Sequence, residues 1–336
     1  MKQMILRSRW SLSVGLIVAL GAVIVAATLS IGVGSVDIDA RVVVASILSF
    51  DDGDFNHLIV RTIRLPRVIA AVLVGAGMAS AGAVMQGLTS NPLASPGLLG
   101  VNAGASLFVV VGISASGSLP LLTYGALSVA GAAVAAALVY GVSSAGSGTR
   151  TPVKLALTGV MFSAFAAAVT TWILITDLDT FDQVRFWTVG SVAGRDMELV
   201  RWMAPIIIVG LVFALIVARQ ITTLSLGEAT ATGLGQKTGR VRAIGAFCVV
   251  LMAGGSVGLA GPVGFLGLVV PHLARPLCGV NYRWVIPYSA VLGALLAVAA
   301  DTAGRAVLKP QEVPIGVMLA AIGAPFLIYI ARWKMR

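Results

Sequence analysis

The chain has 336 residues, of which 58% are hydrophobic and only 11% are charged. A soluble domain of this length cannot bury so much apolar surface, so the composition excludes a water-soluble globular protein and indicates a chain surrounded mostly by lipid. The net charge of +10 does not indicate nucleic-acid binding, because the basic residues are spread over short loops and form no stripe interleaved with aromatic residues.

Ten apolar segments follow one another along the chain. The first has basic residues before it, as a signal peptide has, but it is too long for a signal core and shows no clean cleavage site. The third and eighth fall short of the roughly 17–20 residues of a spanning helix. The sequence therefore predicts an all-α polytopic membrane protein with about ten transmembrane helices in a single domain, residues 1–336. The segments cover residues 11–32, 67–87, 98–113, 120–142, 154–175, 202–218, 242–260, 263–277, 284–301 and 314–331.

The acidic residues separate by side if the N-terminus starts inside and the segments alternate. Twelve of the thirteen then fall in outer gaps, and only Glu228 falls on the inner side, together with fourteen Lys and Arg. The inner side carries +13 and the outer side, with nine basic residues, carries −3, which together give the +10 of the chain. Because Lys and Arg concentrate on the cytoplasmic side of membrane proteins, this pattern predicts that both termini are cytoplasmic.

The two short segments are rich in Gly and Pro. Broken helices at matching positions in the two halves of a membrane protein are typical of a translocation path. Helices that are merely kinked to pack against their neighbours are an equally good interpretation. The residues concerned lie before the third segment, at Asn91, Pro92, Pro96 and Gly97, and in the eighth, at residues 261–267, Pro271 and His272.

The longest inner gap, residues 219–241, contains the only inner acidic residue. Thr223 or Ser225 is positioned to cap a short helix that has Glu228 in its first turn and Gly233 and Gly235 at its end. A short helix at the membrane surface would be a natural contact for a soluble partner, and a plain connecting turn is the alternative.

Two arginines, Arg64 and Arg67, open the second apolar segment. They stand about one turn apart at the outer surface, where exposed guanidinium groups would attract carboxylates, although anchoring at the interface is an alternative. At the outer end of the ninth segment, Asp301 and Arg305 have the spacing of an intrahelical ion pair. We expect no metal site, because neither histidine has further ligands at a suitable spacing, and no nucleotide site, because residues 233–238 lack the Gly-Lys-Thr of a phosphate loop.

Together, these motifs resemble those of the permease subunits of ATP-binding-cassette importers for ferric siderophores, haem and vitamin B12. The resemblance covers essentially the whole chain and implies ten helices with both ends in the cytoplasm. It is carried by Arg64-Leu65-Pro66-Arg67, by residues 82–86 with 91–93 and 96–100, by residues 226–228 with Leu234-Gly235, by residues 267–272, and by Ala300-Asp301 with Arg305.

The resemblance implies a transport subunit of the bacterial cytoplasmic membrane that is not itself an enzyme and needs no cofactor. Its implied partners are a second permease subunit, identical or not, two cytoplasmic ATPase subunits, and a periplasmic or lipid-anchored binding protein. The arginines that would receive acidic residues of the binding protein are Arg64, Arg67 and Arg305. The implied ATPase-coupling residues are Leu224, Ser225, Leu226, Gly227, Glu228, Ala229, Leu234 and Gly235. The implied path and gate residues are Asn91, Pro92, Pro96, Gly97, Thr151, Pro152, Val153, Pro271 and His272.

The implied substrate is a ferric siderophore, because residues 100–106 and 181–187 are more similar to those of siderophore permeases than to those of vitamin B12 permeases. Haem or vitamin B12 import within the same family is one alternative. An ion-coupled secondary transporter is the alternative from another class. That class normally needs ionisable groups deep in the membrane, and the apolar segments contain none that is clearly central.

Overall fold

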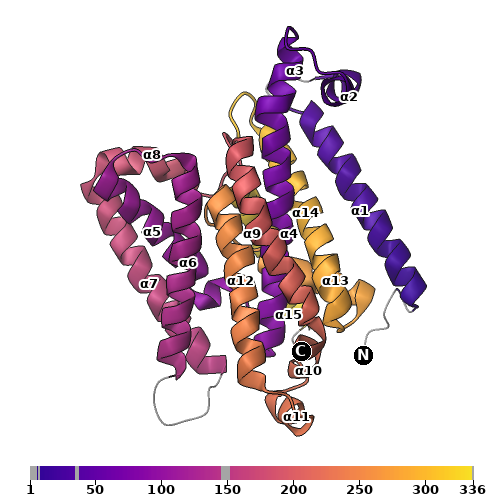
Figure 1. The fold of residues 1–336 in the computed structure, drawn as a ribbon, viewed down its shortest axis with the longest axis vertical. Coiled ribbons are helices and arrows are strands. Elements are labelled where there is room, and N and C mark those ends of the chain that lie inside the picture. The colour runs from indigo at the N-terminus through magenta and orange to yellow at the C-terminus, as the bar shows by residue number, and fades with distance from the viewer. Residues whose placement is uncertain (1–5, 7, 35–37, 145–151, 335–336) are drawn as a thin grey trace.

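The structure is a computed structural model that describes residue 6 and residues 8–34, 38–144 and 152–334. Every regular element in these residues is a helix (Figure 1). The elements are α1 (Arg9–Gly32), α2 (Ala40–Leu48), α3 (Phe55–Ile59), the π-helix η1 (Val60–Arg64), α4 (Leu65–Thr89), the 3-10 helix η2 (Pro96–Leu99), α5 (Val101–Ser116), α6 (Leu121–Ser144), α7 (Pro152–Thr176), α8 (Leu178–Thr188), α9 (Met197–Ile216), α10 (Ala218–Leu224), α11 (Glu228–Gly233), α12 (Thr238–Ala260), α13 (Leu266–Cys278), α14 (Tyr282–Val307) and α15 (Ile315–Lys334).

The predicted all-α membrane architecture is confirmed. In the described residues, seven helical stretches are long and apolar enough to cross a membrane, and three shorter apolar helices accompany them. Each of the ten corresponds to one predicted apolar segment. The third and eighth segments, which the sequence marked as short, are α5 with 16 residues and α13 with 13 residues.

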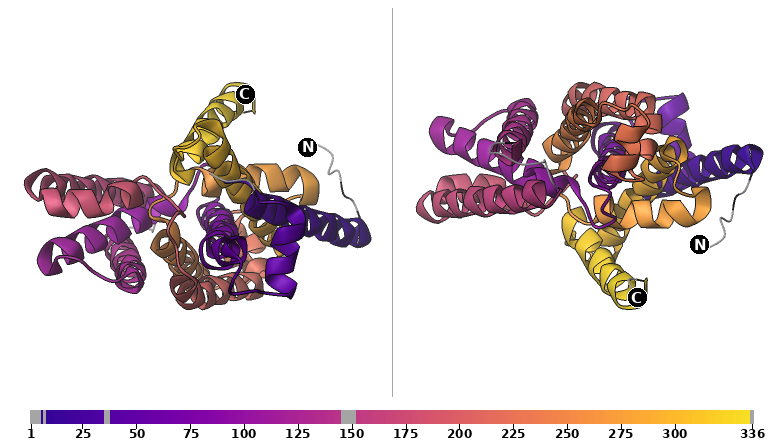
Figure 2. Two further views of the ribbon diagram at one scale, coloured as in Figure 1. Left: turned by 90° about the horizontal axis from the view of Figure 1, so that it is seen from above. Right: turned by 90° about the horizontal axis from the view of Figure 1, so that it is seen from below.

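Helix α4 runs through the middle of the molecule, where α12, α13 and α14 pack around it (Figure 2). Glycines allow these backbones to touch. A Cβ atom on Gly75 would lie 2.2 Å from the carbonyl oxygen of Gly293 on α14, and one on Gly82 would lie 2.0 Å from that of Gly267 on α13. Small residues replace the hydrophobic effect as the device that holds helices together in lipid, so these contacts define a central block formed by α4, α13 and α14.

Helices α5, α6 and α7 form a second group beside the central block, and α12 lies between α6 and α4. Helix α1 stands on the opposite side (Figure 1). Both α1 and α7 are largely exposed, so much of their apolar surface is available to lipid or to a partner.

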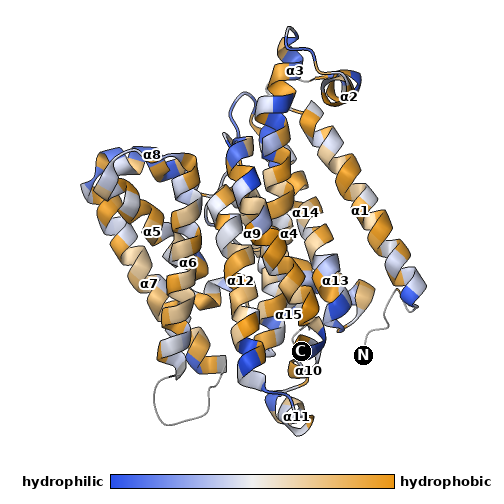
Figure 3. Ribbon diagram, in the orientation of Figure 1, coloured by the Kyte–Doolittle hydropathy of each residue, from blue (hydrophilic) through white to orange (hydrophobic). Residues whose placement is uncertain are grey.

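Short helices cover the two ends of the bundle. The outer end, as we name it here, carries α2, α3 and α8, and the inner end carries α10 and α11 with the start of α1 and the end of α15 (Figure 1). Hydrophilic residues gather at these ends and hydrophobic residues dominate between them (Figure 3). Four of the acidic residues at the outer end have a structural role, because their side chains cap helix N-termini: Asp39, Asp54, Asp177 and Asp196.

Candidate functional site

The two Gly- and Pro-rich segments meet in the interior of the bundle. The Cβ position of Gly267, at the start of α13, is 2.9 Å from Pro96 Cδ of η2. Gln86 of α4 donates from Nε2 to the carbonyl oxygen of Gly267 at 3.2 Å, and Asn102 of α5 donates from Nδ2 to that of Val263 at 3.4 Å. One amide therefore satisfies the irregular backbone at Val263, and the other satisfies the carbonyl that Pro271, which lacks an N–H, leaves without its helical partner. Side chains of neighbouring helices satisfy broken backbone at membrane depth in this way.

The first irregular segment, residues 90–100, is a series of tight turns. Asn91 accepts a hydrogen bond from the backbone N–H of Leu93 through Oδ1 at 2.9 Å, and Pro96 begins the single turn η2. At Gly100 the backbone has φ = +68°, and a Cβ there would lie 2.6 Å from the ring of Phe162 on α7. Glycine at this position therefore permits both the turn and the close approach of α7.

The second irregular segment, residues 261–265, leads into α13. Phe265 precedes the helix with φ = +66°, an uncommon conformation for a residue other than glycine. Within α13, Pro271 lacks an N–H, and the ring Nδ1 of His272 lies 2.9 Å from the carbonyl oxygen of Leu268. Since a carbonyl only accepts, this hydrogen bond requires the tautomer in which Nδ1 carries the proton.

A cavity of about 320 Å³ lies beside Pro262 of the second irregular segment, between α5, α7 and the end of α8. Uncharged polar groups are part of its lining: Asn102, Ser106, Thr170, Thr171 and Thr188. Asn102 Oδ1 and Thr170 Oγ1 are buried and have no hydrogen-bond partner among the described residues. The meeting point of the two broken segments therefore opens onto unsatisfied hydrogen-bonding groups.

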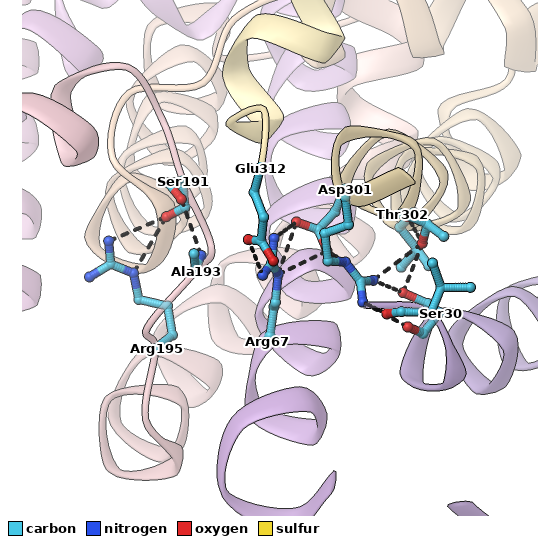
Figure 4. Close-up of polar contacts among 11 residues, drawn as sticks. Ser30, Arg67, Ser191, Ala193, Arg195, Asp301, Thr302 and Glu312 are labelled. Carbon is cyan, nitrogen blue, oxygen red and sulfur yellow. Dashed lines mark hydrogen bonds and ion pairs between the residues drawn. The ribbon is translucent and has the colours of Figure 1, made fainter. Parts of the chain in front are cut away.

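The three arginines of the sequence analysis come together at the outer end (Figure 4 shows Arg67). Arg67 of α4 binds Asp301 of α14 through Nε and Nη2, at 3.1 and 2.9 Å, and Glu312 through Nη1 at 2.7 Å. The Nε atom of Arg305 lies 3.2 Å from Asp301 Oδ2, which confirms the predicted i, i+4 pair. The carboxylate of Asp301 is thus shared between two guanidinium groups.

These arginines also bind the C-terminal end of α1. Arg64 donates from Nη1 to the carbonyl oxygens of Ile31 and Gly32 at 2.6 and 2.9 Å. Arg305 donates to the carbonyl oxygens of Ser30 and Val33. The exposure that we expected for the arginines is therefore wrong: Arg64, Arg67 and Arg305 are only 7%, 9% and 4% exposed.

Arg195 is a buried arginine that the sequence analysis did not identify. It lies in the loop between α8 and α9 at the outer end, and its Nε and Nη2 atoms donate to the carbonyl oxygen of Ser191 at 3.4 and 3.3 Å (Figure 4). No carboxylate of the described chain is within ion-pair distance of it, and burial lowers the pKa of its guanidinium. The adjacent carboxylate of Asp196 instead accepts a hydrogen bond from the N–H of Leu199 as a helix cap.

At the inner end, the predicted short helix is α11, which has only six residues. Glu228 is in its first turn and Gly233 is its last residue, as expected. The expected cap by Thr223 or Ser225 is wrong, because Thr223 lies within α10 and Ser225 is the C-cap of α10, where it donates to the carbonyl oxygen of Thr222. Gly227, with φ = +112°, is the N-cap of α11 instead and provides no side-chain hydrogen bond.

An ion pair and two exposed leucines distinguish this inner region. Glu228 accepts two hydrogen bonds from the guanidinium of Arg242 on α12, at 3.1 and 3.0 Å, and this pair ties α11 to α12. Leu226 and Leu234 flank α11 and are 63% and 70% exposed, whereas Leu224 is buried in the core. Beside Leu234 there is a polar hollow of about 220 Å³ that Arg219, Gln220, Thr223 and Gln236 help to line.

The gate residues implied by the resemblance lie at the start of α7. Thr151 is outside the described residues, Pro152 begins the helix, and Val153 is exposed. In the described part of the chain, no three His, Cys, Asp or Glu side chains are grouped to hold a metal ion.

Comparison with known proteins identifies the family. The model of the FecCD transport family matches residues 22–333, which is nearly the whole chain. The chain belongs to the FecCD transport family. This FecCD protein is therefore a permease subunit and a multi-pass bacterial membrane protein, as the sequence analysis predicted, and the alternative of an ion-coupled secondary transporter is not supported.

Curated relatives of this FecCD permease match over nearly their full length. The siderophore transport system permease protein YfiZ of Bacillus subtilis is 44% identical over 97% of this chain and 96% of its own. The ferric enterobactin transport system permease protein FepD of Escherichia coli is 39% identical over 93% of each chain. A solved metal-chelate type ABC transporter in an inward-facing conformation matches with a TM-score of 0.83 and 25% identity, over 95% of this chain and 99% of its own.

Proposed function

We propose that this FecCD permease carries a ferric siderophore across the bacterial cytoplasmic membrane, driven by ATP hydrolysis on separate subunits. The relatives named for siderophores and ferric enterobactin support the substrate class. The observation that carries the proposal is the contact between the two broken segments, which places uncharged polar groups beside irregular backbone inside the bundle. Substrate sites in transporters are built in this way at membrane depth.

The translocation path would be completed by a second permease subunit. Helix α7 is largely exposed along its apolar length, and α15 projects from the bundle (Figure 2). The irregular segment beside α7 contains Asn91, Pro92, Pro96 and Gly97. A path between two such subunits would have these segments, α7 and α13 on its walls, with Pro152 and Val153 at its inner mouth.

Two ATPase subunits would bind at the inner end, one on each permease. The exposed Leu226 and Leu234, on either side of α11, offer an apolar contact to a soluble protein, and the hollow beside Leu234 offers polar groups. Movement of a docked subunit would pass to α12 through the ion pair between Glu228 and Arg242.

The outer end would receive the binding protein. Glu312 is the accessible acidic group beside the arginine cluster. Its side chain is 37% exposed and forms an ion pair with Nη1 of Arg67. An acidic residue of the binding protein that approached Arg67 would have to displace Glu312.

Uptake assays test the proposed function. A strain without this permease should lose uptake of one ferric siderophore while haem and cobalamin uptake are unchanged, and the cloned gene should restore it. The uptake should stop when ATP is depleted and persist when only the proton gradient is collapsed. Uptake that follows the proton gradient and ignores ATP would contradict an ATP-driven importer, and loss of haem or cobalamin uptake instead would change the substrate class.

Labelling of introduced cysteines tests the orientation. Cys248 and Cys278 are both buried, so the background should be low. A cysteine at Asp52, which is exposed at the outer end, should react with an impermeant thiol reagent added to intact cells. A cysteine at Thr232 on α11 should react only after the membrane is opened. The reverse pattern would invert the orientation and with it the roles proposed for the two ends.

Glu312→Gln tests docking at the outer end. Because this change removes an internal competitor for Arg67, we expect the binding protein to associate more tightly by up to about fivefold, the equivalent of one exposed ion pair. Asp52→Asn removes the same charge away from the cluster and is the control for net charge. Surface plasmon resonance at low and high salt measures both. Weaker association of Glu312→Gln would show that Glu312 is itself the docking contact.

A further inference from the structure

A groove on the side of the molecule that carries α6 and α12 is not used by the proposed transport path. It has a volume of about 310 Å³ and is lined mainly by apolar side chains of these two helices. Ala133 and Ala137 of α6 contribute to one wall, and Ala243 and Ala246 of α12 contribute to the other. These short side chains leave the space between the helices unfilled, whereas larger residues would close it.

The groove is closed towards the outer end and lies in the inner half of the bundle. Gly254 of α12 sits directly against α6, since a Cβ there would lie 3.0 Å from Ala132 Cβ and 3.4 Å from Val129 Cα. Closer to the inner end, the alanines of the two walls leave α6 and α12 without such a contact, and the groove opens there. The groove lies in the hydrophobic band of the molecule (Figure 3), and α15 projects from the opposite side (Figure 2).

A basic residue stands at the inner end of the groove. Arg240 precedes Ala243 by three positions and Phe247 by seven, so it shares their face of α12. It is exposed and has no ion pair with any residue that the structure describes. Side chains on a helix lean towards its N-terminus, so the guanidinium extends past the groove towards the membrane surface. Tyr140 of α6 lines the same end, as is typical of tyrosine at a membrane interface.

We propose that this groove binds an anionic phospholipid, with one acyl chain between α6 and α12 and the phosphate at Arg240. The apolar walls match an acyl chain, and the basic residue at membrane-surface depth matches the headgroup charge. Basic pockets between helices on the cytoplasmic side are typical sites for such lipids. The bound lipid fills the space between α6 of the α5–α7 group and α12.

Native mass spectrometry of the full-length permease, purified from nanodiscs that mix phosphatidylcholine with phosphatidylglycerol or cardiolipin, tests this site. The wild-type protein should retain one anionic lipid at detergent concentrations that remove phosphatidylcholine. Ala137→Leu puts a branched side chain into the groove and should abolish this retention. Ala22→Leu, at an exposed position of α1, is the matched control and should retain the lipid.

The role of the Arg240 charge in selecting anionic lipid is tested separately. Arg240→Gln should lower the preference for anionic over zwitterionic lipid by about fivefold, the effect of one basic residue near the surface. Arg283→Gln removes an exposed charge at the inner end on α14 and should leave the preference unchanged. Equal retention by Ala137→Leu and Ala22→Leu would overturn the groove as the site. An equal preference in Arg240→Gln and Arg283→Gln would overturn the role of Arg240.

Discussion

Replacing Asp301 by alanine should destabilise the permease by about 3–5 kcal/mol, the typical effect of removing one partner from a buried ion pair. Asp301 is the carboxylate that Arg67 and Arg305 share, and all three groups are buried. Without it, two guanidinium groups would stay close together with one half-exposed acid, Glu312, beside them. We expect a large drop in the thermal unfolding temperature of the detergent-solubilised protein.

Asp182→Ala is the control for this change. Asp182 also pairs with an arginine, Arg185, but both side chains are more than half exposed, and exposed pairs contribute only about 0–1 kcal/mol. The two variants therefore remove the same chemical group from a buried and an exposed setting. If both unfold at the wild-type temperature, the cluster at the outer end does not stabilise the fold.

Reversing the charge of Glu228 should reduce uptake by at least about tenfold, because like charges placed in contact cost more than the 1.4 kcal/mol that corresponds to a factor of ten. Glu228→Arg would set an arginine against Arg242 and push α11 away from α12. Folding should survive, since Glu228 is half-exposed and lies outside the core. Substrate uptake and substrate-stimulated ATP hydrolysis in reconstituted vesicles measure the effect.

The exchange variant Glu228→Arg with Arg242→Glu separates two explanations of that loss. It restores the ion pair in the opposite sense, so uptake should largely return if the pair transmits movement within the permease. Continued loss in the exchange variant would mean that Glu228 contacts the ATPase directly. Normal coupling in Glu228→Arg alone would remove the coupling role from α11.

Hydrophobic patterning was sufficient to predict the ten apolar helices and the two short ones, because each depends on residues within one continuous segment. The pairing of Asp301 with Arg305 was predictable for the same reason, since their i, i+4 spacing is local. The burial of Arg64 was not predictable in this way. It depends on the carbonyl oxygens of Ile31 and Gly32, which precede it by more than thirty positions.

Two further features were not predicted correctly. Ser225 has the right chemistry for a helix N-cap, but it is the C-cap of α10 and has helical backbone angles, and Gly227 is the N-cap of α11. Arg195 was not identified because its acceptor, the carbonyl oxygen of Ser191, is a backbone group that the sequence does not mark. In both cases the sequence shows a group that can make an interaction, whereas the folded chain decides which group is available.

The glycine contacts of the central block bear on how the permease changes shape. Helices whose backbones touch at Gly75 with Gly293 and at Gly82 with Gly267 cannot slide past one another without steric overlap, so α4, α13 and α14 should move as one rigid body. Alternating access requires some part of a transporter to rock against another. The turns at residues 90–100 connect α4 to the α5–α7 group without a continuous helix, and we expect the motion that opens and closes the path to be concentrated there.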